Sequence, residues 1–180
     1  MELAALLQEN RETILGKWFE LISKSYPEVT SKFLAKQKDR FRNPVGYAIS
    51  QSIGPIYDQV VSAMDTDQLL EALDGIIRIR SVQDFTPTET IAFVFQLKGL
   101  IREVIDDQIR GPDRWTDLAA LESRIDRVAL LAFEKYTECR EQLHQVRNRE
   151  IESRAARVLG RVNAMPDISQ HEEEPIDDNV

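Results

Sequence analysis

Apolar residues recur three, four or seven positions apart along most of the chain, which is the spacing of one face of an α-helix. An opening segment with this spacing ends near Tyr26-Pro27, and a short piece follows from Val29 to Gln37. Strands would instead alternate apolar and polar residues between turn dipeptides, and we find no such pattern. The sequence therefore predicts an all-α fold with five or six helices.

Local signals mark the starts of the next two helices. Asn43-Pro44 combines a good capping residue with a proline at the first helical position. We expect this helix to reach about Met64 and to be kinked or split at Gly54-Pro55. Asp65 then starts a third helix, which ends between Arg80 and Phe85.

The sharpest local signal is Thr86-Pro87-Thr88-Glu89, a capping box with Thr86 as the N-cap. The helix that it opens is apolar on nearly all sides and is stopped by Gly111-Pro112, so it is predicted to be the central core helix. From about Trp115 to Asn163 helical spacing continues without proline for roughly 45 residues, or about 65–70 Å. The fold predicted is a compact helical bundle with a long protruding C-terminal helix.

Composition and charge divide the chain into three parts. Residues 1–140 carry the core pattern, residues 141–163 extend the last helix as a charged stretch, and residues 164–180 form an acidic tail predicted to be disordered. The formal charge is −8, but six acids and no Lys or Arg lie from Ala164 onward, so the body is near −2. The acidic balance therefore describes the tail and says little about the partners of the body.

Two further observations bear on the compartment. The single cysteine, Cys139, cannot form an intrachain disulfide, which fits a reducing compartment. No apolar run approaches the roughly 18 residues of a membrane span. We therefore expect a cytoplasmic, soluble protein without membrane insertion.

Arg78 and Arg80 lie among isoleucines just before the capping box, and a buried guanidinium needs a partner. In one interpretation both finish the third helix, pairing with Asp74 and Asp84 at a spacing of four. In the other, Arg80 joins Arg102 of the core helix in a fork that binds a small anionic ligand, with Arg78 and Asp84 at its edge. The pattern favours the structural interpretation and leaves the ligand site open.

Catalytic and cofactor chemistry find little support in the residues. His144 and His171 lie far apart, and with one cysteine they make neither a metal site nor a nucleophile constellation. No histidine between Leu3 and Arg140 can serve as a proximal haem ligand. There is no phosphate-binding glycine loop and no serine elbow. We expect no enzyme, no metal and no cofactor, and Cys139 is expected to be a packed core residue.

The final helix carries two patterns of its own. Arginines recur every seven residues and form a basic stripe, and apolar residues follow a four-three-four seam on another face. The seam indicates a homodimeric or partner-bound coil, while a single solvated helix with pairs such as Glu150–Arg154 explains the same residues. Nucleic acid is disfavoured, because no aromatic or fold motif accompanies the stripe. The stripe consists of Arg140, Arg147, Arg154 and Arg161, and the seam of Ile151, Ala155, Val158 and Val162.

Three phrases, FRNPVGYAIS, IIRIRSVQDFTPTETIAFVFQLKGLIRE and ESRIDRVALLAFEKYTECRE, carry a family likeness. Over roughly residues 10 to 150 the chain resembles the N-terminal domain of RsbRD, a co-antagonist of the RsbT kinase in the bacterial stressosome. The resemblance implies a helical input module, related in shape to non-haem globin sensors, that signals to an output domain through its C-terminal helix. The stretch MPDISQHEEEPIDDNV after that helix is too polar to fold alone, so we expect no output domain of the usual kind here.

The pattern and the resemblance together favour a non-catalytic sensor module that acts through protein–protein contact. Its expected partners are proteins, among them a regulatory kinase. Stand-alone members of the resembled family lie beside genes for membrane redox complexes, so an accessory role in such a complex is an alternative. Binding of a small anion at Arg80 and Arg102 is the other alternative.

Overall fold

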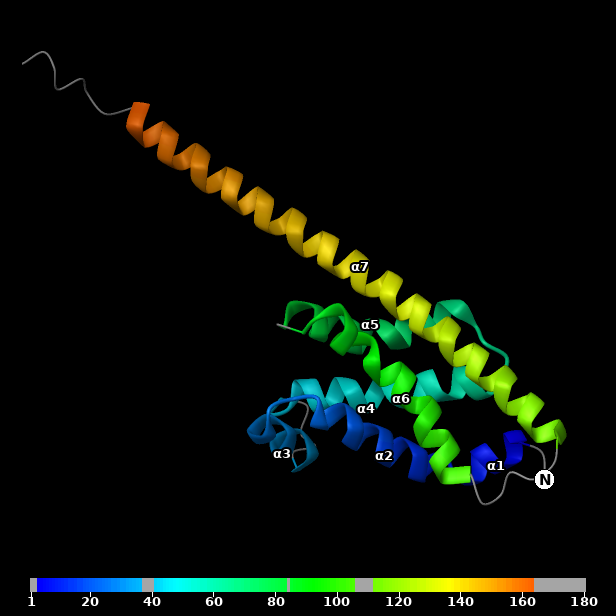
Figure 1. Cartoon of the computed structure of the whole chain (residues 1–180). Coiled ribbons are helices and arrows are strands. Elements are labelled where there is room, and N and C mark those ends of the chain that lie inside the picture. Colours follow the sequence, from blue (N-terminus) through cyan, green and yellow to red (C-terminus); the bar gives the residue numbers. More distant parts are fainter. Residues whose placement is uncertain (1–2, 37–40, 84, 106–111, 164–180) are drawn as a thin grey trace, which may run out of the picture. The chain divides into compact units, whose positions relative to one another are not determined.

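A computed structural model describes residues 3–36, 41–83, 85–105 and 112–163. By packing, the chain separates into two units, Met1–Glu141 and Gln142–Val180. Figure 1 labels the helices in chain order. The described residues contain no strand, which confirms the all-α prediction. The elements are α1 (Leu3–Glu9), α2 (Arg11–Lys24), α3 (Glu28–Lys36), α4 (Pro44–Val61), α5 (Thr66–Val82), α6 (Pro87–Ile105) and α7 (Pro112–Asn163).

The described part of the chain thus holds seven helices, and the predicted five or six is wrong. The opening segment divides at Asn10, whose side-chain amide and backbone nitrogen both donate to the backbone oxygen of Leu6 (2.9 and 3.1 Å). The short piece after Pro27 is a helix of its own, α3. In contrast, α4 continues through Gly54-Pro55 without a split, with Pro55 exposed on its outer side.

The predicted caps form as expected. Asn43 accepts a hydrogen bond from the backbone nitrogen of Gly46 (2.8 Å) at the start of α4, and Asp65 caps α5. In the capping box, Glu89 N donates to Thr86 Oγ1 (3.2 Å) and Thr86 N donates back to Glu89 Oε2 (2.8 Å). This reciprocal pair fixes the first turn of α6 and lowers the pKa of the Glu89 carboxyl, chiefly through the backbone hydrogen bond from Thr86.

The core of the first unit is one continuous apolar cluster. Within it, α4 packs along α5, and α2 packs on both α4 and α6. Trp18 lies fully buried on α2, where its Nε1 donates to the backbone oxygen of Phe93 (2.8 Å) and its indole stacks on the Phe93 ring. Tyr57 of α4 donates to the backbone oxygen of Leu7 (2.9 Å). These buried donors are satisfied, as stable cores require.

α7 spans 52 residues, or about 78 Å at 1.5 Å per residue. In its first-unit part, the predicted core row is buried, and so is Cys139, which supports its role as a packed residue. The row consists of Leu118, Leu121, Ile125, Val128, Ala132 and Tyr136. In the second unit, described side chains from 144 to 161 are all exposed, and α7 there lacks a buried face. The fold is thus a compact helical bundle with a long last helix.

Candidate functional site

Arg80 lies in the last turn of α5, and only 1% of it is exposed. Its Nη1 donates to the backbone oxygen of Glu89 in the first turn of α6 (2.9 Å). Its Nη2 donates to Ser25 Oγ just beyond α2 (2.7 Å) and makes a long contact with the backbone oxygen of Ile22 (3.4 Å). One guanidinium therefore ties together the end of α2, the end of α5 and the start of α6.

Three aromatic rings surround this guanidinium. Its central carbon lies 4.9 Å from the ring centroid of Phe85, 5.4 Å from that of Tyr26 and 5.6 Å from that of Phe93. Such ring faces attract a cation, the more so where water is excluded. Burial lowers the pKa of the Arg80 guanidinium. Burial also raises the pKa of the Tyr26 phenol, while the nearby Arg80 charge acts to lower it. The Arg80 cation is therefore held by neutral oxygens and rings, and we name this group of contacts the Arg80 node.

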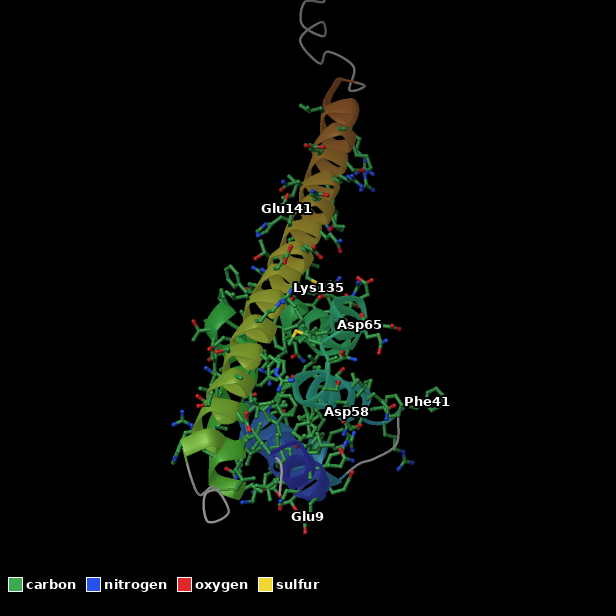
Figure 2. The ribbon with its side chains drawn as sticks, turned by 90° about the vertical axis from the view of Figure 1, so that its right-hand side faces the viewer. Glu9, Phe41, Asp58, Asp65, Lys135 and Glu141 are labelled. Carbon is green, nitrogen blue, oxygen red and sulfur yellow. The ribbon has the colours of Figure 1, made fainter. Side chains whose placement is uncertain are left out.

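Arg78 has the structural role predicted for it. Its Nε and Nη2 donate to the two carboxylate oxygens of Asp74, one turn earlier on α5 (both 3.1 Å). Lys135 of α7, labelled in Figure 2, pairs with the same carboxylate (3.1 Å). These cations lower the pKa of Asp74, with the hydrogen bond from Arg78 as the largest cause. Asp74 thus joins α5 to the first-unit part of α7.

The other members of the predicted anion site do not gather around Arg80. Arg102 is exposed on α6 and forms a bidentate pair with Glu122 of α7, with 2.8 Å between Nη2 and Oε2. It lies 13 residues beyond Glu89 on α6, or about 20 Å along the helix. Asp84 lies outside the described residues. The structure therefore places Arg80 and Arg102 in separate environments.

Most of the residues predicted for the terminal helix lie exposed on α7. Arg140 lies at the end of the first unit, half-buried, and its Nη1 donates to the backbone oxygen of Ser81 (3.3 Å). Arg154 pairs with Glu150 one turn earlier (2.5 Å), and Arg147 and Arg161 are exposed. The described seam side chains are exposed too, whereas that of Val162 lies outside the described residues. The exposed seam residues are Ile151, Ala155 and Val158.

A groove between α6 and α7 is a feature that the sequence interpretation missed. It has a volume of about 690 Å³ and is open to solvent on one side. Ile91, Ala92 and Phe95 line it from α6, and Ala129, Leu130 and Phe133 from α7. The excess of apolar residues on α6 is the available signal, but the same excess is expected of a helix that is buried on all sides. Phe95 is in fact half-exposed, so α6 is not buried on every side.

The described residues can be searched for a metal-binding group and for a membrane-spanning helix. No group of three or more His, Cys, Asp and Glu side chains in the described segments could hold a metal ion. None of the described helices combines the length and apolar composition needed to cross a membrane.

These observations define the class of protein: an all-helical bundle with a capped core helix and a long last helix. The family model for the RsbT co-antagonist protein rsbRD N-terminal domain matches residues 12–151. The chain therefore belongs to this family of stressosome-type regulatory sensor domains, and the resemblance noted from the three sequence phrases is confirmed. No curated protein and no solved structure matches the chain.

Proposed function

We propose that the chain is a non-catalytic sensor module that acts through protein–protein contact, with α7 carrying the response. Membership of a regulatory co-antagonist family supports the general role. The observation that carries the finer proposal is the exposed apolar seam of Ile151, Ala155 and Val158 on α7. When a second helix covers apolar side chains at a four-three spacing, their removal from water stabilises the pair of helices.

The partner proposed first is a second copy of the chain, paired in a parallel coil along the seam. The basic stripe of Arg147, Arg154 and Arg161 then flanks the seam and remains available to a protein partner such as a regulatory kinase or a redox complex. The cytoplasm as the place of action, and a likeness in shape to non-haem globin sensors, belong to the same proposal.

Sedimentation equilibrium tests the coil directly. The double variant Ile151→Glu, Val158→Glu puts charge into the seam, and we expect it to sediment as a monomer while the wild type sediments as a dimer. Val146→Glu, Leu159→Glu is the matched control, because these two side chains are as exposed (61% each) as Ile151 (64%) and Val158 (59%) but lie off the seam. A seam variant with the wild-type mass would refute the coil.

Binding of a small anion at Arg80 and Arg102 stays a prediction. The separate environments of the two guanidinium groups give it no shared fork, but each can be tested by itself. A ligand that binds the folded state raises the melting temperature by mass action. A screen of anionic metabolites against wild type and Arg102→Gln tests the exposed member of the pair.

A further inference from the structure

The groove between α6 and α7 lies wholly in the first unit and is separate from the seam. Two ion pairs define its geometry, Lys98 with Asp126 (2.7 Å) and Arg102 with Glu122. Four residues forward on α6 correspond to four residues back on α7, so the helices run antiparallel here. Three residues in the opposite direction from Lys98 and Asp126, back on α6 and forward on α7, Phe95 comes opposite Ala129, within the groove.

The lining of the groove is almost entirely apolar. Its polar groups are the hydroxyl of Thr88 and the side-chain amide of Gln96, and no charged side chain lines it. The nearest cation along α6, Lys98, is already neutralised by Asp126. A ligand with a net charge would lose its hydration here without gaining a counter-ion, which is costly. The groove therefore selects a neutral molecule.

The exposed apolar area is small for a protein interface. Phe95, Leu130 and Phe133 are 51%, 71% and 52% exposed. At about 150–250 Å² for a large side chain, these three present roughly 300 Å². A stable dimer buries about 800 Å² on each partner, so this patch is too small to hold a second copy by itself. In contrast, the groove volume of about 690 Å³ lies inside the range of about 300–1,000 Å³ that is usual for small-molecule sites.

We propose that this groove is a binding site for a neutral, largely apolar small molecule that carries a ring or an acyl chain and at most one or two hydrogen-bonding groups. Its apolar body packs against Phe95, Leu130 and Phe133, and its polar end reaches Thr88 or Gln96. This inference deepens the proposed sensor function and rests on it. The link is α7, which supplies one wall of the groove and also carries the seam. A ligand that fits one arrangement of α6 and α7 better than another shifts the population of that arrangement.

The test uses the full chain and the neutral fluorescent probe N-phenyl-1-naphthylamine. We expect saturable enhancement of its fluorescence with one site per chain. Phe95→Gln and Leu130→Gln each change an exposed side chain, so the fold should survive. Each should lower the affinity for the probe at least tenfold. Ala92→Trp fills the groove while keeping its surface apolar, and it should abolish binding. The control Phe33→Gln alters a phenylalanine of similar exposure (47%) on α3 and should leave binding unchanged.

Three results would overturn the site. One is the lack of saturable binding to the wild type, and another is equal binding by wild type and Ala92→Trp. The third is a lower sedimentation mass for Leu130→Gln than for the wild type, with unchanged binding of the probe. That result would make the groove an interface between copies. The seam variant Ile151→Glu, Val158→Glu should bind the probe normally. The groove and the seam can therefore fail independently.

Discussion

Replacement of Arg80 tests whether the Arg80 node is a structural tie. Arg80→Met keeps much of the buried volume but removes the charge, whereas Arg80→Ala removes both. The acceptors left behind in Arg80→Met keep other hydrogen bonds, since the Ile22 oxygen also accepts from the nitrogen and hydroxyl of Ser25. The methionine variant therefore leaves few polar groups unpaired.

The expected magnitudes follow from these contacts. Two short hydrogen bonds from a charged donor contribute about 1.5–3 kcal/mol each, and the three rings add about 1–2 kcal/mol. Desolvation of the guanidinium, several kcal/mol, offsets most of this gain. We expect Arg80→Met to lower the free energy of unfolding by about 1–2 kcal/mol. Arg80→Ala also opens a cavity beneath the rings, and we expect a loss of about 3–5 kcal/mol.

Urea unfolding followed by circular dichroism measures both variants. The slope with urea should stay constant, so that the midpoint reports stability alone. Equal losses for Met and Ala would show that the charge, not the packed volume, carries the stabilisation, contrary to this expectation. A loss below about 0.5 kcal/mol for Ala would show that Arg80 does not tie the three helices at all.

Three further predictions concern the contacts that hold the first unit together. Thr86→Ala removes the N-cap of α6 and should lower the unfolding free energy by about 1 kcal/mol in urea, with Thr86→Ser as the control that keeps the hydroxyl. The lowered pKa of Asp74, caused first by Arg78, means that its stabilisation is complete above the ordinary carboxyl pKa of about 4 and is lost as the pH falls through the lowered pKa. The stability difference between wild type and Asp74→Asn should accordingly be constant near neutral pH and vanish in acid, and a difference that persists in acid would contradict it. Trp18→Phe keeps most of the ring but loses a buried donor, and should cost about 1–3 kcal/mol by thermal unfolding.

Helix starts and core rows could be predicted from the sequence because their causes are local. The capping box at Thr86 and the row from Leu118 to Tyr136 depend on residues within a few turns of one helix. The division at Asn10 was missed, since the apolar spacing continues across it. The sequence left open whether α4 splits at Pro55, because only the fold shows that this proline lies on the exposed side.

In the candidate sites too, local contacts could be predicted from the sequence and contacts between distant segments could not. The Asp74–Arg78 pair could be predicted from a spacing of four. The partners of Arg80 could not, because Ile22 and Ser25 are more than 50 residues away in the chain. The groove needs two helices at once, and an exposed Phe95 cannot be told from a buried one by periodicity alone.

Cysteine cross-linking shows directly whether α7 pairs with a second α7 along its seam. In a Cys139→Ser background, Val158→Cys places a thiol on the seam and Leu159→Cys places one beside it, on residues of nearly equal exposure. Under mild oxidation we expect rapid covalent dimers for Val158→Cys and slow ones for Leu159→Cys. Equal rates for the two variants, or no dimer from Val158→Cys, would contradict it.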